Sequence, residues 1–414
     1  MFSRSFLAKS KPQASFTLIE LLIVIAILAV LMSVIIITIN PSEMLKRTRD
    51  TRRISDLKTL NNAIQYFQSS LPDASLGSLN TVYVSIPDTS ATCANLGLPS
   101  LPSGWSYHCS TPDNYRKIDG TGWIPINFKQ LDIGAPISAL PIDPLNQTST
   151  GNYYTYVVGG SWKFTTRFES DKYILENTAK DGGVDPALYE IGSDLTLAPF
   201  TGGLVCYWSF DEASGTTVYD YSGYSNNGTM YSSTTPYDFH TSANCKLGSC
   251  ASFDGVDDYV DMGNGASLNI NNEITVSLWV EPNLINGQQG VLSDSGLWSN
   301  HYYIYLRNEV NAQYAWGVSY TNWFRTGNML VGQWQHIVGV YSKTTGVANL
   351  YINGVLIASG SWTSPIVTSF NKLYIGQAPG IAAPVFLNGL IDDVRIYNRA
   401  LSAAEIKALY DATK

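Results

Sequence analysis

The stretch SFTLIELLIVIAILAVLMSVIIITI, residues 15–39, decides how the N-terminal part of this chain is organised. Within residues 21–39 every residue is apolar except Ser33 and Thr38. As a helix rising roughly 1.5 Å per residue, this run reaches about 28 Å, close to the bilayer core of about 30 Å. The preceding residues, 1–15, contain basic side chains and no acid. The positive-inside rule therefore predicts a single membrane pass with this leader in the cytoplasm.

A cleaved secretory signal peptide is the alternative interpretation, but the run is long and no small-x-small site follows it. After Pro41, apolar residues recur every three or four positions as far as Phe67, which indicates an amphipathic helix. Pro41 is expected to kink this helix where it leaves the membrane. Four arginines are expected to form a solvated face opposite the apolar stripe: Arg47, Arg49, Arg52 and Arg53.

Glu20 is the anomaly of the apolar segment. A carboxylate at the edge of a membrane span costs about 2–3 kcal/mol unless it is paired, so such a residue is functional by default. No basic residue lies within the span. A positive partner is therefore expected from a chain terminus or from another molecule.

The segment closely resembles the class III signal of type IV pilins and type II secretion pseudopilins, through residues 15–20 (SFTLIE) and the following LLIVIAIL. The resemblance implies a leader of residues 1–15, cleavage before Phe16 by a prepilin peptidase, and N-methylation of the new Phe16 amine. Residues 16–40 would be the transmembrane assembly helix. Glu20 would meet the N-terminal amine of a neighbouring pilin or pseudopilin subunit. One position departs from the family, because Ser15 stands where Gly is usual.

Residues 41–200 are predicted to form the helix extension and a small α+β head. Short β-type runs occur at 81–86, 153–158 and 162–168, between turn signals. LPIDPLN (140–146) and the nearby YYTY resemble the pseudopilin head. Some pseudopilin heads bind calcium, so Asp143 could be a ligand, although a turn Asp is the commoner role. A linker is expected around residues 195–203.

Strand signals recur every 10–15 residues from Gly203 onward. In residues 273–280 apolar side chains alternate with Thr, Ser and Trp, the period of two that a strand requires. Asn353–Gly354 lies between two apolar runs and predicts a hairpin. Ser402 and Glu405 form a capping box that opens a short terminal helix. The C-terminal part is therefore predicted to be an all-β jelly-roll sandwich, which makes the chain a multidomain protein.

Several stretches of this region resemble LamG-like jelly-roll domains of the concanavalin A-like lectin/glucanase superfamily. They are GLVCYWSFD (203–211), DYSGYSNNG (220–228), SFDGVDDYV (252–260), YING (351–354) and NGLIDDVRIYNRALS (388–402). The resemblance covers essentially all of residues 201–414. It implies binding of an extracellular carbohydrate or protein ligand, often with a calcium ion.

Calcium prefers several oxygen ligands, mostly carboxylates and carbonyls. Asp211 ends the first strand signal and Asp392 lies in the last long one. First and last strands are neighbours in this superfamily, so the two could share an ion. Asp220 and Asp254 are weaker candidates. The alternative for all four is turn capping, which is common for Asp in β proteins.

An aromatic cluster lies between residues 298 and 323; it comprises Trp298, Tyr302, Tyr303, Tyr305, Trp316, Tyr320 and Trp323. Aromatic faces stack on sugar rings, but aromatics on strands more often fill the core or cover the sheet. Core packing is the favoured interpretation for the cluster. Trp298 and Trp323, which are predicted to lie in loops, are the candidates for ligand binding.

The five cysteines show no paired CxxC spacing, and only 4 His occur, so a structural zinc site is not expected. An exported chain permits disulfides, and the local pairs Cys93–Cys109 and Cys245–Cys250 are predicted. Cys206 would then remain free. The alternative is five reduced, buried thiols.

The formal net charge of −8, with 25 basic and 33 acidic residues, argues against a nucleic-acid partner. Retaining glycosidases need two carboxyls about 5–5.5 Å apart. Related glucanases carry them in an E-x-D-x-x-E pattern, which does not occur in residues 201–414. The chain is therefore not expected to be an enzyme.

The sequence favours a minor pilin or pseudopilin-like subunit that is held in the cytoplasmic membrane and displays a lectin-like adhesion domain on the cell surface or a pilus. A bulky C-terminal domain would limit the number of copies in one filament. The alternatives are a secretion-system pseudopilin that contacts exported substrates, a membrane-anchored monomer that never polymerises and, less favoured, a surface glycosidase.

Overall fold

The computed structural model describes residues 17–414 with several exceptions. The exceptions are 73, 179, 198–201, 213, 233–238, 241–243, 285–286, 295–301, 309–311, 320–321, 327, 363–365, 367–371 and 379–383. The side chains of residues 30, 31, 33–39, 239 and 240 are also outside the description. The predicted leader, including Ser15, and the predicted new N-terminal residue Phe16 therefore lie outside the described residues.

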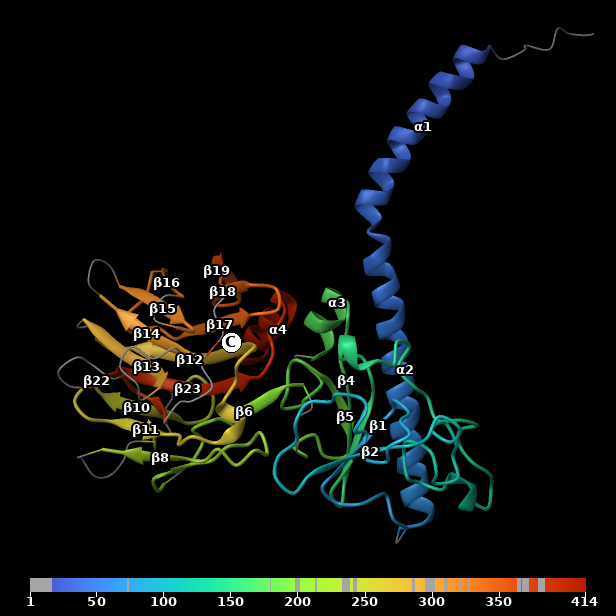
Figure 1. The fold of residues 1–414 in the computed structure, drawn as a ribbon, viewed down its shortest axis with the longest axis horizontal. Coiled ribbons are helices and arrows are strands. Elements are labelled where there is room, and N and C mark those ends of the chain that lie inside the picture. The colour runs from blue at the N-terminus through green and yellow to red at the C-terminus, as the bar shows by residue number, and fades with distance from the viewer. Residues whose placement is uncertain are drawn as a thin grey trace, which may run out of the picture.

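Two successive helices form the N-terminal arm (Figure 1), with α1 at Leu18–Ile39 and α2 at Pro41–Ser70. They meet at Asn40, whose left-handed φ of 43° interrupts the helix. The Asn40 side chain accepts a hydrogen bond from the Glu43 amide. Pro41 is the first residue of α2. At this position a backbone N–H has no helical acceptor, so the absence of an N–H in proline costs no hydrogen bond. The structure therefore has a break at Asn40 where the sequence predicted a kink at Pro41.

The described side chains of α1 are exposed, including Leu18 and the run from Leu21 to Leu28. Within the described part of the chain, no helix is both long enough and apolar enough to cross a membrane.

A five-stranded sheet, called here the head sheet, follows α2. Its strands are β1 (Thr81–Val84), β2 (Ser106–Cys109), β3 (Thr155–Val158), β4 (Trp162–Thr166) and β5 (Tyr189–Gly192), in the order β2-β1-β3-β4-β5. The β1–β2 pair is parallel and the other pairs are antiparallel. The short helix α3 (Asp171–Tyr173) continues into a π-helical turn, η3 (Ile174–Thr178), between β4 and β5. The predicted α+β arrangement is therefore present.

The C-terminal half of α2 packs its apolar stripe against the head sheet. Leu57, Leu60, Ile64 and Phe67 are at most 1% exposed and belong to one cluster with aromatic side chains of the sheet and its loops. Burial of such side chains stabilises the fold by about 1.5–3 kcal/mol each. The predicted helical stripe is thus what fixes α2 on the head.

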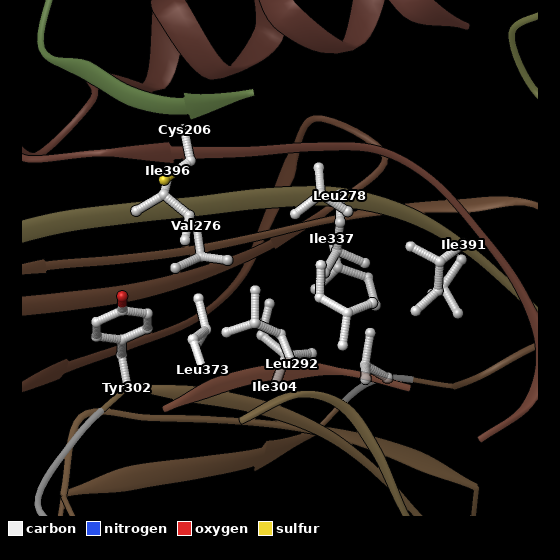
Figure 2. Packing of buried hydrophobic residues seen from close by; sticks show 14 of the residues in the cluster. Cys206, Val276, Leu278, Leu292, Tyr302, Ile304, Ile337, Leu373, Ile391 and Ile396 are labelled. Atoms are coloured by element: carbon white, nitrogen blue, oxygen red, sulfur yellow. The ribbon is translucent and has the colours of Figure 1, made fainter. Parts of the chain in front are cut away.

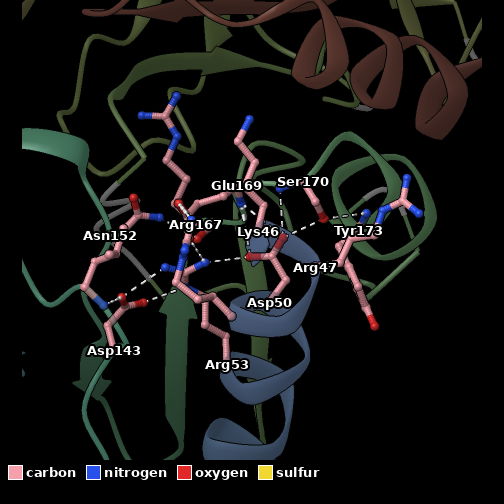
Figure 3. A network of polar contacts seen from close by, with 12 residues as sticks. Lys46, Arg47, Asp50, Arg53, Asp143, Asn152, Arg167, Glu169, Ser170 and Tyr173 are labelled. Carbon is pink, nitrogen blue, oxygen red and sulfur yellow. Dashed lines mark hydrogen bonds and ion pairs between the residues drawn. The ribbon is translucent and has the colours of Figure 1, made fainter. Parts of the chain in front are cut away.

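The predicted solvated arginine face is wrong for Arg53, whose side chain is completely buried. Its guanidinium contacts Asp50 and Glu169 through Nη1 at 2.6 and 2.7 Å and Asp143 through Nε at 2.6 Å (Figure 3). Arg49 also binds Glu169, with an Nε–Oε2 distance of 2.6 Å. The buried face of α2 therefore includes an arginine in addition to the apolar residues. Arg53 can be buried because carboxylates from distant loops neutralise its charge in the interior.

The C-terminal part is a sandwich of two eight-stranded sheets. The first, called here the helix-side sheet, has the order β19-β18-β17-β12-β23-β10-β9, with β6 also paired to β23. Its strands are β6 (Leu204–Trp208), β9 (Phe239–His240), β10 (Cys250–Asp254), β12 (Glu273–Pro282), β17 (Gln335–Ser342), β18 (Val347–Ile352), β19 (Val355–Ser361) and β23 (Asn388–Tyr397).

The second sheet, called here the outer sheet, has the order β16-β15-β14-β13-β20-β11-β8-β7. Its strands are β7 (Thr217–Val218), β8 (Gly228–Tyr231), β11 (Tyr259–Asp261), β13 (Gln288–Asp294), β14 (Tyr303–Arg307), β15 (Gln313–Gly317), β16 (Trp323–Thr326) and β20 (Leu373–Ile375). A separate two-stranded ladder joins β21 (Gln377–Ala378) to β22 (Val385–Phe386).

The core lies between these two sheets (Figure 2). Val276, Leu278 and Ile337 from the helix-side sheet face Leu292 and Ile304 from the outer sheet. All five side chains are 0% exposed. The predicted alternation along β12 is confirmed. The predicted Asn353–Gly354 turn is also present, with φ of 51° and 74°, the signs that a tight two-residue hairpin turn needs.

Helix α4 (Ala403–Thr413) closes the chain and connects the sandwich to the head. Ile406 and Leu409 pack on Val338 and Val340 of the helix-side sheet, whereas Ala408 belongs to the hydrophobic cluster of the head. The predicted capping box, Ser402 with Glu405, is present. Figure 1 shows α4 lying between the two parts.

A buried ion cluster strengthens this junction. Glu405, 2% exposed, accepts hydrogen bonds from Arg399 of the sandwich at 3.0 Å and lies 3.1 Å from Arg167 of the head. The Tyr224 hydroxyl adds a further hydrogen bond to the Ser100 carbonyl of the head. The sandwich is therefore packed on the head and not merely tethered through the predicted linker.

Both predicted disulfides are present. Cys93 is bonded to Cys109 in the head and Cys245 to Cys250 in the sandwich. Cys206 is a free thiol that is completely buried on β6.

Candidate functional site

Glu20 is the third residue of α1, in its first turn, and is exposed. Its Oε2 accepts hydrogen bonds from the amide and hydroxyl of Thr17 at 2.9 and 2.8 Å, and the Thr17 hydroxyl accepts one from the Glu20 amide. This capping box gives the carboxylate a neutral partner in its own chain, which the sequence interpretation missed. Since Thr17 carries no charge, the Glu20 charge is left without a cation among the described residues.

Asp211 and Asp392 converge on the loop that the Cys245–Cys250 disulfide closes. β6 pairs with β23, so the predicted neighbourhood of first and last strands is present. Asp392 Oδ2 accepts a hydrogen bond from the Leu247 amide at 2.7 Å, and Asp211 Oδ1 accepts one from the Ser249 amide at 2.8 Å. Asp392 and Asp211 therefore each accept a hydrogen bond from one backbone amide of this loop, at positions 247 and 249.

Asp392 is buried with only part of its hydrogen-bonding capacity satisfied. Its side chain is 0% exposed, and its Oδ1 has no hydrogen-bond partner among the described residues. Burial, with smaller contributions from the carboxylates of Asp393 and Asp211, raises the pKa of Asp392 to about 8. An orphaned buried carboxylate oxygen beside two other acids is a chemically reasonable position for a hard cation.

The exterior face of β12 next to this pair is covered. Trp279 stacks on Tyr410 of α4 at a centroid distance of 5.7 Å and donates its indole N–H to Thr413. The Lys246 ammonium lies 4.2 Å from the Trp279 ring centroid on the side of the disulfide loop. Ser277 on the same face bonds the buried ring of His336 at 2.8 Å. The helix and the disulfide loop therefore occupy this face.

Asp220 is a turn-capping residue. Its two carboxylate oxygens accept hydrogen bonds from the amides of Tyr207, Ser222 and Asn226 at 2.9–3.0 Å. The structure places it away from any group of three acids that could share an ion among the described residues.

Asp254 is brought together with two acids that the sequence interpretation did not select. One carboxylate oxygen from each of Asp254, Asp257 and Asp258 lies within 4.8 Å of the others. The D-x-x-D-D spacing within SFDGVDDYV was the available signal, because a turn of this length returns the last two acids towards the first.

The described members of the aromatic cluster include buried residues, as predicted for core packing, but Trp323 lies in strand β16 and not in the predicted loop. Tyr302 and Trp316 are buried in the core at 2% and 0% exposure, whereas Trp323 on the edge strand β16 is 37% exposed. The guanidinium groups of Arg325 and Arg307 lie 5.1 and 5.5 Å from its ring centroid. Trp298 and Tyr320 lie outside the described residues. The sequence interpretation did not select the two arginines, which reach Trp323 from β14 and from β16 itself.

Residues 10–36 match the family profile of the prokaryotic N-terminal methylation motif, and residues 254–407 match that of the concanavalin A-like lectin/glucanases superfamily. The chain joins a pilin-type methylation motif to a concanavalin A-like domain. This confirms both resemblances seen in the sequence. The concanavalin A-like match covers most of the sandwich, from the end of β10 into α4.

Solved structures to which this chain is similar include domain 4 of an extracellular arabinanase from Geobacillus stearothermophilus in complex with arabinotriose. It is 24% identical, with a TM-score of 0.39 and coverage of 51% of this chain and 98% of that domain. A Trypanosoma rangeli sialidase is 14% identical, with a TM-score of 0.40 and coverage of 63% and 48%.

The binding domain of Paraclostridial Mosquitocidal Protein 1 is 16% identical, with a TM-score of 0.40 and coverage of 51% and 52%. The chain thus spans about half the length of the last two proteins. A comparison with curated protein sequences finds no match.

Proposed function

We propose that the protein is a minor pilin or pseudopilin-like subunit that carries a concanavalin A-like binding domain on the cell surface. The methylation motif at residues 10–36 carries this proposal. In it, Glu20 falls five residues into a chain that starts at Phe16, and its charge is left for the N-terminal amine of a neighbouring subunit. Residues 1–15 are then a leader, residues 16–40 the membrane and assembly helix, residues 41–200 the helix extension and head, and residues 201–414 the displayed domain.

Two measurements test this proposal. Mass spectrometry of the protein from native membranes is expected to show a chain that begins at N-methylated Phe16 after prepilin peptidase cleavage. Glu20→Gln is expected to abolish incorporation into filaments. Glu43→Gln, at a half-buried acid in the first turn of α2 that pairs with Lys46 and Arg47, serves as the matched control. Normal incorporation of Glu20→Gln would contradict the assembly role.

The minor-subunit assignment rests on the size of the sandwich and its close packing on the head through α4. A filament in which every subunit carried this domain would have to accommodate it at each repeat. We expect purified filaments to contain this chain at a small fraction of the major subunit. Co-purification with secretion components in place of a pilus would favour the pseudopilin alternative.

For the displayed domain, we infer recognition of a carbohydrate or protein ligand, with no catalysis. Trp323 is the candidate contact because it is partly exposed on an edge strand of the outer sheet, whereas α4 covers part of the helix-side sheet. Glycan-array and cell-binding assays are expected to detect a ligand that Trp323→Ala weakens at least tenfold. Tyr219→Ala, an exposed aromatic at the opposite edge of the sandwich, is the control. Release of sugars from β-glucans would contradict the binding assignment.

Calcium is the proposed cofactor of the Asp211–Asp392 pair. The orphaned Oδ1 of Asp392 and the adjacent Asp211 carboxylate supply hard oxygen ligands, and the amides of Leu247 and Ser249 in the disulfide loop hold one oxygen of each carboxylate in place. Calorimetric titration of the purified protein is expected to lose one calcium site in Asp392→Asn. Retention of every site in that variant would exclude the pair.

A further inference from the structure

A lysine and a glutamate face each other, completely buried, on the last two strands of the head sheet. Lys163 of β4 pairs with Gly192 of β5, so Glu190 is its diagonal neighbour across the two strands. The Lys163 Nζ lies 3.0 Å from Glu190 Oε1. Taking two charges out of water is costly, and uncharged groups in place of a buried ion pair are often neutral or stabilising. A reaction that removed both charges would relieve this cost.

The contact between these two groups does not have the geometry of a hydrogen bond. Glu190 Oε1 has no hydrogen-bond partner among the described residues, although the Lys163 nitrogen lies within reach. The other oxygen, Oε2, accepts a hydrogen bond from the Asp185 amide at 3.0 Å. The lysine nitrogen is therefore packed against one oxygen of a carboxyl group whose other oxygen is held by a backbone amide. Because Oε1 is bonded to Cδ, the carboxyl carbon is also close to this nitrogen.

The loop that leads into β5 encloses the Glu190 carboxyl group. A Cβ added at Gly183 would lie 2.0 Å from Glu190 Oε2, so only glycine lets the backbone lie this close. Asp181 Oδ2 accepts a hydrogen bond from the Glu190 amide at 2.7 Å. Burial is the largest cause that raises the pKa of Asp181 to about 7 and the pKa of Asp185 to about 6. Both acids can therefore carry a proton near neutral pH.

A cavity of about 340 Å³ adjoins the pair. Glu190, Asp181 and Leu195 are among its lining residues. The Lys163 ammonium donates a hydrogen bond to the Leu195 carbonyl at 3.3 Å, which orients the nitrogen beside this cavity. A small molecule released at the Glu190 carboxyl group would have room to leave through it.

We propose that Lys163 and Glu190 condense to an isopeptide bond that joins β4 to β5. The Lys163 ammonium first passes a proton to Glu190 Oε1, which leaves a neutral amine beside a carboxylic acid. Nζ then bonds to Cδ, and the Asp185 amide stabilises the charge that develops on Oε2. A neighbouring acid carries a second proton from Nζ to Oε1, the Cδ–Oε1 bond breaks, and water leaves. The atoms balance without an oxidant or a further reactant.

The bond lies on the covalent path from the head to the sandwich. β5 is the edge strand of the head sheet, bonded on one side only, to β4. The chain continues from β5 into β6 of the sandwich, so a pull on the sandwich peels β5 from β4. A covalent bond between the two strands prevents this. The inference uses none of the residues proposed for assembly or ligand binding and does not depend on the proposed function.

Peptide mass spectrometry of the full-length protein tests the proposal. After reduction of the disulfides and tryptic digestion under denaturing conditions, residues 130–167 are expected to be joined to residues 181–246, because trypsin does not cleave after a linked lysine. The joined peptides should be lighter than their sum by the mass of one water. The exposed pair Lys172–Glu176, separated by 3.8 Å, is the matched control in the same digest. Residues 168–180 should show no loss of water.

The double variant Lys163→Met, Glu190→Gln removes the amine and both buried charges together. It is therefore expected to fold and to give separate peptides of unmodified mass. A joined peptide in this variant, or separate unmodified peptides from the wild-type protein, would overturn the proposal. A loss of water confined to residues 181–246, without the partner peptide, would identify an imide at Asp181–Gly182 and would also overturn it.

Discussion

The junction between the sandwich and the head should depend on the ionised form of Glu405. In Glu405→Gln the shape is kept, but the charge facing Arg399 and Arg167 is lost. Burial alone would raise the pKa of Glu405; the Arg399 and Arg167 guanidinium groups outweigh it and hold this pKa at about 2, against an ordinary value of 4.5. That difference corresponds to about 3 kcal/mol of stability at neutral pH. Removing one member of a buried pair has a similar cost, about 3–5 kcal/mol.

The sign of the pH dependence follows from the lowered pKa. The stabilisation is fully present above about pH 4.5 and is lost as the pH falls towards 2. Urea unfolding of wild type and Glu405→Gln between pH 7 and pH 2.5 should show a gap of about 3 kcal/mol that closes at low pH. Hydrogen exchange should show that α4 is the segment that opens.

Asp411→Asn is the matched control on the same helix, because its ion pairs with Lys407 and Lys414 are partly exposed. Exposed pairs contribute about 0–1 kcal/mol, so this variant should remain close to wild type. A Glu405→Gln protein as stable as wild type at pH 7, or a gap that stays constant down to pH 2.5, would refute the reasoning.

Three further variants test other parts of the structure. Arg53→Met should destabilise the head by about 3–5 kcal/mol in urea unfolding, because it leaves Asp50 and Asp143 buried without a cation, whereas exposed Arg52→Met should have little effect. With calcium chelated, the wild-type free energy of unfolding should fall by up to about 5 kcal/mol as the pH rises from 3.8 through 8, because the pKa of Asp392 in the folded protein is raised to about 8. Melting temperatures measured across this pH range should show the fall in wild type, and Asp392→Asn should remove it. Leu278→Ala should cost about 2–5 kcal/mol by calorimetry, since Leu278 is 0% exposed between the sheets.

Much of the fold could be predicted from local patterns. Alternation along residues 273–280 identified the core face of β12, and Asn353–Gly354 identified the hairpin between β18 and β19. Both signals act over a few residues, because a strand has a fixed period of two and this turn needs positive φ at both positions. The methylation motif was likewise readable, since its residues are contiguous.

The candidate sites were only partly predictable. The proximity of Asp211 and Asp392 followed from the expected pairing of the first and last strands. The hydrogen bonds that these carboxylates accept from amides of the disulfide loop could not be predicted in this way. Asp257 and Asp258 were overlooked because their importance depends on how a turn folds back. Arg325 lies two residues after Trp323 on β16, so its position could have been inferred from the period of a strand. Arg307 reaches Trp323 from β14, two strands away in the outer sheet, which the sequence does not state.

By itself, the sequence determined the apolar N-terminal run, the periodic faces of helix and strands, and the two disulfide pairs, because each depends on spacing along one short segment. Only the tertiary structure decided that Arg53 is buried against Asp143, 90 residues away, and that α4 joins the sandwich to the head. A charged side chain can be buried only where distant segments supply its counter-charges, and no local pattern records which segments will meet it.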